Sequence, residues 1–232
     1  MKYQLPKNYR NTQCDSEDDE DDITSKLFRQ AHLPFFQNTQ QIRYIKAYID
    51  EEIREPKYYR PLIQAIETMS EHDGIQLSVN SYGGRLDGAI ALINAIQSTE
   101  GSVQVCIDGV AASAASLIAL AAPNLAVGPY ASMMIHAATF GSFGKQSNVI
   151  SHASFIDKTV KNLMKEVYQD FLTEDEFEQV MMGKEIWLTS DEIIERLELR
   201  EKLVEQRVNA ELAAMESQVT KPKRPRKAKS ED

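Results

Sequence analysis

Cysteine is scarce in this sequence, with two residues in 232, too few for a disulfide framework or a cysteine-based metal site. Cys14 lies in an acidic, polar stretch, whereas Cys106 lies in an apolar run, so we expect no disulfide between them. A reducing compartment follows from this usage, and the cytoplasm is the expected location.

Long apolar runs are also lacking. The longest, residues 110–122, is alanine-rich and is interrupted by Ser113 and Ser116. A membrane-spanning helix needs about 20 mostly apolar residues, so we expect no membrane segment. Residues 1–10 are polar and do not have the apolar run of a signal peptide.

A net positive charge is the third absence. The chain has 26 Lys and Arg against 35 Asp and Glu, for a net charge of −9, so the core is not expected to bind nucleic acid. Charge gathers at the two ends, in an acidic run at 17–22 and a proline-broken basic run at 221–229. Such runs resist packing, which predicts two disordered tails; a docking role, or binding of an anionic partner, is the alternative for each.

Between the tails, predicted strands and helices alternate, which is typical of an α/β fold with a largely parallel sheet. Apolar alternation predicts the strands and helical spacing predicts the helices. The strands are expected at 42–49, 75–79, 103–107 and 132–135, and the helices at 59–69, 89–96 and 113–122.

A longer helical pattern follows from residue 149, with apolar residues recurring in steps of four and three. It predicts one helix over about 146–171, long enough to project and to contact a second copy of the chain. Two capping boxes then predict two more helices. Thr173 with Glu176 opens a short helix that ends near residue 183, and Thr189 with Glu192 opens one that extends as far as residue 215.

Three segments that follow predicted strands carry groups suited to acyl transfer. The adjacent Gly83 and Gly84 allow positive φ and close approach of a ligand to backbone amides. Ser113 begins a buried helix, whose free N–H groups favour an alkoxide and an oxyanion. His136 ends a strand, where it can reach a neighbouring strand end as a general base. Taken singly, the glycine pair is also consistent with an ordinary turn, Ser113 with a helix cap and His136 with a structural histidine. Their order along the chain, however, supplies every group that acyl transfer needs.

Together, the three segments resemble the signatures of the Clp protease proteolytic subunit family. They read Asn-Ser-Tyr-Gly-Gly at 80–84, Gly-Val-Ala-Ala-Ser at 109–113 and Met-Ile-His at 134–136, and the resemblance covers roughly residues 42–195. It implies a crotonase-like fold of repeated β/α/β units and cleavage of unfolded polypeptide inside a closed chamber. The helix at 149–170 matches the handle that joins two heptameric rings in that family, and an AAA+ unfoldase is an implied partner.

The resemblance also implies roles for individual residues. Ser113 is the expected nucleophile and His136 the expected base. The amides of Gly84 and Ala114 would form the oxyanion hole, with Gly83 in the substrate-binding loop. No cofactor and no metal are expected.

Three departures from the family pattern limit this transfer. Glu185 stands where the family usually has an aspartate; it is the expected acid, with Asp157 and Asp191 as weaker substitutes. Tyr82 replaces a proline in the oxyanion loop. The glycine-containing strand expected after the last short helix gives way to a charged helical segment from about residue 197.

The sequence as a whole predicts a serine endopeptidase. We expect an acidic, disordered extension over 1–34, a peptidase domain over 35–200, and a segment over 201–232 that is helical and then basic and disordered. One alternative is a catalytically silent ring scaffold subunit, and another is a phage-type capsid or scaffold maturation protease. An acyl-CoA hydratase or isomerase shares the fold, but that chemistry has no role for a Ser/His pair.

Overall fold

The computed structural model describes residues 42–139, 141 and 143–219, and within the last helix it does not describe the side chains of 214 and 216–219. The disordered tails predicted for 1–34 and for the basic end of the chain lie outside these residues. Six strands form one sheet in the order β1-β2-β3-β5-β6, with β4 pairing β3 beside this path. The strands are β1 (Tyr44–Ile49), β2 (Gly74–Ser81), β3 (Ser102–Ala112), β4 (Asn124–Val127), β5 (Ser132–Ile135) and β6 (Ile186–Thr189).

Every strand pair in this sheet is parallel except β5 with β6, so the prediction of a largely parallel α/β fold is confirmed. The sequence analysis did not predict β4 and β6, which are only four residues long. It also ended β3 too early, because the strand continues through the small residues up to Ala112. The second half of β3 pairs with β5, and this pairing carries the strand to the edge where Ser113 begins the next turn.

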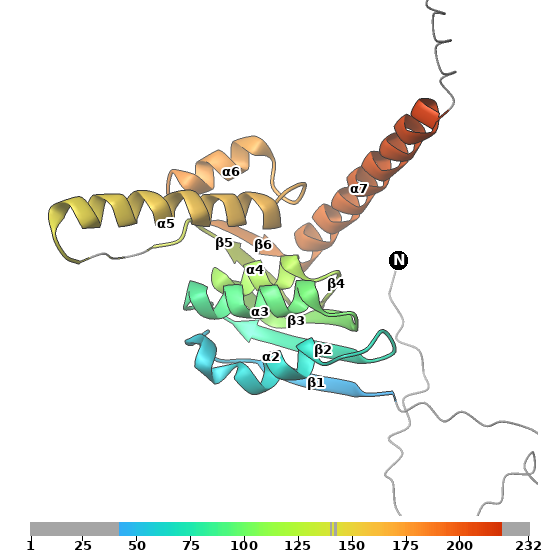
Figure 1. The fold of residues 1–232 in the computed structure, drawn as a ribbon, viewed down its shortest axis with the longest axis horizontal. Helices are drawn as coiled ribbons and strands as arrows, with labels where there is room; N and C mark the ends of the chain where they lie inside the picture. The colour runs from blue at the N-terminus through green and yellow to red at the C-terminus, as the bar shows by residue number, and fades with distance from the viewer. Residues whose placement is uncertain (1–41, 140, 142, 220–232) are drawn as a thin grey trace, which may run out of the picture. The chain divides into compact units, whose positions relative to one another are not determined.

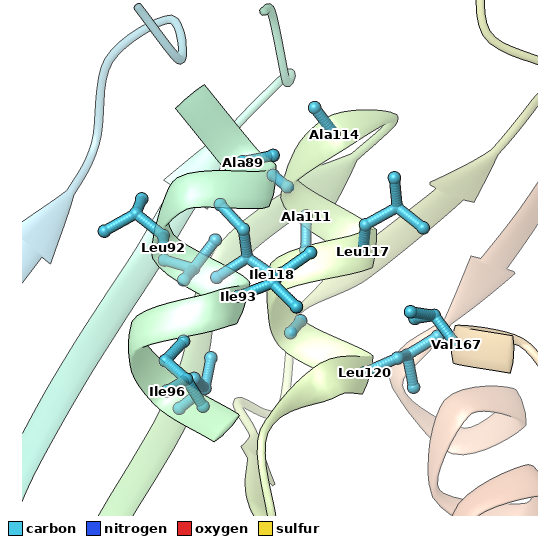
Figure 2. Packing of buried hydrophobic residues seen from close by; sticks show 14 of the residues in the cluster. Ala89, Leu92, Ile93, Ile96, Ala111, Ala114, Leu117, Ile118, Leu120 and Val167 are labelled. Carbon is cyan, nitrogen blue, oxygen red and sulfur yellow. The ribbon is translucent and has the colours of Figure 1, made fainter. Parts of the chain in front are cut away.

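Three helices lie along one face of β1–β3: α2 (Arg60–Glu67), α3 (Leu86–Ser98) and α4 (Ala114–Ala121) (Figure 1). A single 3₁₀ turn, η1 (Pro56–Tyr58), precedes them. Alternate residues of β2 and β3 are buried, as a half-covered strand requires. Figure 2 shows the apolar side chains of α3 and α4 packed against each other, with Val167 from the end of α5 (Gln146–Val167) beside Leu120.

The long helix α5 is buried only at its C-terminal end, through Val160, Met164 and Val167. Its first half exposes Ile150 and Phe155, which are 58% and 68% accessible. The helix ends four residues before the expected residue 171, with Tyr168 as its C-cap, and Asp170 beyond it adopts a left-handed φ of 61° that an α-helix cannot include.

Two helices complete the described chain: α6 (Glu174–Met181) and α7 (Ser190–Val219). The predicted capping box of Thr173 and Glu176 is present at the start of α6. A continuous helix, α7, stands where a glycine-containing strand would be expected from the resemblance. In the part of the chain that is described, no helix is both long and apolar enough to span a bilayer.

The Arg196 guanidinium joins α7 to α6 and holds the pKa of the Glu176 carboxyl at about 2, well below its usual range. The pair is bidentate, at 2.9 Å from Nη1 to Oε2 and 2.6 Å from Nη2 to Oε1. Since the folded-state pKa is lowered, the stability that the pair contributes is present above the unfolded pKa near 4.3 and is lost as the pH falls towards 2.

Replacement of Arg196 by methionine is therefore expected to lower the free energy of unfolding by about 1 kcal/mol at neutral pH. The difference between variant and wild type should shrink as the pH falls from about 4 to 2, measured by chemical denaturation. Arg85→Met is the control, because Arg85 pairs with Asp87 in an equally bidentate but more exposed position. A loss as large for Arg85→Met would contradict the role given to the partly buried Arg196–Glu176 pair.

Candidate active site

Ser113 occupies the turn between β3 and α4 in a conformation that is unusual for a residue with a side chain. Its φ is 55° and its ψ is −122°. Such a conformation costs on the order of 1–3 kcal/mol and persists only where the surroundings hold it. The completely buried Ala111 and Ala112 leave little room for another path, and the Ser113 N–H donates to the Met134 carbonyl at 2.8 Å. The turn places the serine hydroxyl at the edge of the sheet, just beyond the end of β3.

His136 meets this hydroxyl directly. Its Nε2 lies 2.7 Å from Ser113 Oγ, within hydrogen-bonding distance. Strand register brings the two together, because Ala112 of β3 pairs in parallel with Met134 of β5. The residues just beyond both strand ends therefore share one edge of the sheet. The structure thus brings together the two side chains that the sequence analysis singled out from segments 23 positions apart.

The Gly83–Gly84 loop lies against Ser113. Gly83 has a φ of +96°, and a Cβ added there would lie 2.8 Å from Ser113 Cβ and 3.0 Å from the Ala114 nitrogen. The Ser81 hydroxyl fixes the loop, accepting from the Gly83 N–H at 3.1 Å and donating to a backbone carbonyl of the segment after β1 at 2.6 Å. Only glycine fits at position 83, because any side chain there would clash with Ser113 and Ala114.

The amides expected to form an oxyanion hole, those of Gly84 and Ala114, donate to no carbonyl among the described residues. Gly84 forms an isolated parallel bridge with Ile53, but the hydrogen bonds of this bridge are made by its neighbours Gly83 and Arg85. Ile53 N–H donates to the Gly83 carbonyl at 2.8 Å and its carbonyl accepts from Arg85 N–H at 2.7 Å. Two unused N–H groups beside a nucleophile are what oxyanion stabilisation requires.

The expected acid of the triad, Glu185, is not hydrogen-bonded to His136 among the described residues. The antiparallel pairing of β5 and β6 ends where Ile135 faces Ile186, so His136 and Glu185 are the residues that flank the last pair. The Glu185 carboxylate, however, accepts a hydrogen bond from Trp187 Nε1 at 3.2 Å. The substitutes Asp157 and Asp191 lie exposed on α5 and α7. Within the described part of the chain, no hydrogen bond joins His136 to any of these three carboxylates.

Replacing Glu185 with glutamine is expected to lower kcat about 10²-fold, if the carboxylate turns to His136 during the reaction, since an amide holds the imidazolium poorly. Trp187→Phe is the matched variant, because it removes the competing N–H donor and keeps an aromatic ring. It should leave kcat unchanged or raise it. Steady-state hydrolysis of a fluorogenic peptide measures both, and a fall for Trp187→Phe as large as that for Glu185→Gln would contradict this role.

A cleft of about 450 Å³ opens beside the loop. Three consecutive acidic residues after β1 form one wall, and the oxyanion loop forms the other; the lining residues are Asp50, Glu51, Glu52, Asn80, Ser81, Tyr82, Gly83 and Gly84. Among the residues that the structure describes, no group of three or more His, Cys, Asp or Glu side chains could hold a metal ion.

Sequence reasoning missed several residues around the nucleophile. Ile53 gave no signal, because it lies in a polar segment between predicted elements. Ser116, in contrast, is a polar residue inside a buried alanine-rich helix, and that pattern was a usable signal. Its hydroxyl bonds the buried Tyr168 from the end of α5 at 2.9 Å, a contact between positions 52 residues apart that no local pattern could indicate.

The geometry comprises a serine on a strained turn, an imidazole at hydrogen-bonding distance and two free amides nearby. The family model "Clp protease" matches residues 18–196, more than three quarters of the sequence. The chain belongs to the Clp protease family. The fold is accordingly the crotonase-like α/β fold of that family, as expected.

Relatives in the Clp protease family are distant. The ATP-dependent Clp protease proteolytic subunit 2 of Treponema denticola is 28% identical over 167 residues, 71% of this chain and 82% of the relative. The proteolytic subunit 1 of Chlamydia caviae is 30% identical over 119 residues, 49% of this chain and 62% of that relative. The solved structure of a ClpP1 point mutant from Listeria monocytogenes has a TM-score of 0.53 at 22% identity, over 65% of this chain and 86% of its own, and this likeness concerns the fold alone.

Proposed function

We propose that this Clp protease family member is a serine endopeptidase with Ser113 as its nucleophile. The observation that carries the proposal is the 2.7 Å contact between Ser113 Oγ and His136 Nε2 at the edge of the sheet. For the serine O–H to donate to Nε2, the imidazole must carry its own proton on Nδ1. Nδ1 is then the atom that a carboxylate at position 185 would orient.

In the first half of the reaction, Ser113 Oγ attacks the carbonyl carbon of the scissile peptide and His136 Nε2 takes the hydroxyl proton. The carbonyl oxygen becomes an oxyanion, which the N–H groups of Gly84 and Ala114 stabilise. When the intermediate collapses, Nε2 gives the proton to the departing amine nitrogen, the C–N bond breaks, and Ser113 keeps the acyl group.

In the second half, a water molecule gives a proton to Nε2 and attacks the acyl carbon. Collapse of the second intermediate breaks the ester bond and returns the proton to Ser113 Oγ. The new carboxyl end of the substrate then leaves. The peptide would lie extended beside the Gly83–Gly84 loop, as an added strand.

The assembly and partners follow the family as part of the same proposal. The N-terminal half of α5 exposes Ile150 and Phe155, which supports a role as the handle between stacked rings. An oligomeric chamber would restrict substrates to unfolded or partner-delivered polypeptides, with an AAA+ unfoldase as the delivering partner. The peptidase domain is proposed for 35–200, although α7 continues through residue 200 without a break. The cytoplasmic location stays a prediction.

One observation favours a second function, that of a catalytically silent ring subunit. The Glu185 carboxylate bonds Trp187 in this structure, and without an orienting acid His136 is a weaker base. The presence of both Ser113 and His136 at bonding distance favours the active enzyme.

Degradation of casein by the purified native assembly separates the two functions. Wild type should produce peptides and Ser113→Ala none, at equal assembly mass. Addition of an unfoldase with ATP should speed the cleavage of folded substrates. Casein left intact by the assembled wild type alone, but degraded once the wild type is mixed with an active paralogue, would favour the silent subunit.

A further inference from the structure

The strained turn at Ser113 depends on how its carbonyl group is held. That carbonyl accepts the N–H of Ser116 at 3.0 Å and the N–H of Leu117 at 3.4 Å, as expected for the first turn of a helix. It also accepts the hydroxyl of Ser116 at 2.7 Å, the shortest of the three contacts. The side chain at position 116 therefore contributes directly to the backbone geometry of the nucleophile.

The direction of the next hydrogen bond follows from counting protons. A carbonyl only accepts, so the single hydroxyl proton of Ser116 points to Ser113. The contact of 2.9 Å between Ser116 Oγ and the Tyr168 hydroxyl must then be donated by Tyr168. The result is a directed chain from the tyrosine O–H to the serine O–H to the carbonyl of the nucleophile, in which each donor strengthens the next.

Both hydroxyl groups are buried, since Ser116 is 0% and Tyr168 2% accessible. Burial raises the pKa of Tyr168 far above its usual value, so the phenol remains a donor throughout the range in which a peptidase would be assayed. Neighbouring Val167 packs beside Leu120 of α4 (Figure 2), which fixes the end of α5 against the helix that begins at the nucleophile.

A purely structural explanation does not account for the polar pair. The other residues of α4 are apolar, namely alanine, leucine and isoleucine. Alanine and phenylalanine at 116 and 168 would fill nearly the same space and would leave no buried hydroxyl group that needs a partner. Ser116 lies three residues after Ser113 and donates to its carbonyl oxygen, and Tyr168 reaches that carbonyl only through Ser116.

We propose that Ser116 and Tyr168 are positioning residues that hold the Ser113 hydroxyl in line with His136 and the oxyanion amides. This inference rests on the proposed peptidase function and adds two residues to its machinery. Neither residue touches the substrate. Their effect should therefore fall on the rate of acylation rather than on the binding of the peptide.

Three variants in the full chain test this role: Tyr168→Phe, Ser116→Ala and the double variant. Hydrolysis of a short fluorogenic peptide should show kcat lowered about tenfold for each single variant, with KM unchanged. Because Tyr168 acts through Ser116, the double variant should be no slower than Ser116→Ala. Labelling by a fluorophosphonate should slow by the same factor.

Ser98→Ala is the matched control, because Ser98 is a serine in α3 that also donates to the carbonyl three residues earlier, at 3.3 Å. It should keep the wild-type kcat. A kcat for Tyr168→Phe within twofold of wild type would overturn the inference, as would an equal loss in Ser98→Ala or multiplied losses in the double variant. Should Ser116→Ala fail to assemble, Tyr168→Phe alone decides, since it removes one oxygen. An inactive and unlabelled wild type would instead refute the peptidase function on which the inference rests.

Discussion

His136→Ala is expected to lower kcat for peptide hydrolysis by about 10⁴-fold or more. In the proposed mechanism the imidazole, 2.7 Å from Ser113 Oγ, is the group that takes the hydroxyl proton during attack. Without it, the proton must pass to water and the serine reacts as an ordinary alcohol. The amine would also leave without a proton donor, so both steps of acylation are impaired.

Steady-state hydrolysis of a fluorogenic peptide measures this loss, with the mass of the assembly checked in the same preparation. His72→Ala serves as the control, because His72 is an exposed histidine whose nearest ion-pair partner is Glu71 at 3.4 Å. It should retain the wild-type rate. Activity of His136→Ala within tenfold of wild type would show that another group supplies the base.

Gly83→Ala is expected to lower kcat by about 10³-fold. A methyl group there would lie 2.6 Å from the Ala112 carbonyl oxygen and 2.8 Å from Ser113 Cβ, which are closer than real Cβ contacts. Since both neighbours belong to the nucleophile turn, relief of the clash must shift the loop or the turn. Either shift moves the amides of Gly84 and Ala114 relative to the serine hydroxyl, and oxyanion stabilisation depends on that geometry.

The chain offers a control glycine with nearly the same φ. Gly183 has a φ of +100°, against +96° at Gly83, but an added Cβ there would meet nothing within 4 Å. Gly183→Ala thus carries the conformational strain of about 1 kcal/mol without the clash. Its kcat should match wild type, measured beside the thermal midpoint of both variants. If both variants lost activity equally, backbone strain rather than the clash with Ser113 would explain the effect of Gly83→Ala.

The parts of the site that the sequence could predict are those that local pattern specifies. Ser113, His136 and the two glycines each follow a strand, and parallel strands gather such positions at one edge. The capping box at Thr173 is likewise a local signal, and it is present in the structure. These features needed no knowledge of long-range packing.

What the sequence could not predict depends on side-chain directions, on individual backbone angles and on contacts between distant segments. The direction of the Glu185 side chain is set by Trp187, a neighbour whose indole N–H competes for the same carboxylate. The hydrogen bond between Ser116 and Tyr168 joins positions 52 residues apart. The left-handed backbone of Asp170, just beyond α5, is a conformation that aspartate permits but does not require.

If Ser113 is an activated nucleophile, a fluorophosphonate should modify it covalently. The folded, assembled wild type is treated with a fluorophosphonate and digested, and the modified residue is located by mass spectrometry. One adduct is expected, on Ser113, which is absent from Ser113→Ala and forms slowly in His136→Ala. An assembled wild type that remains unlabelled, or that is labelled equally in Ser113→Ala, would contradict this role of Ser113.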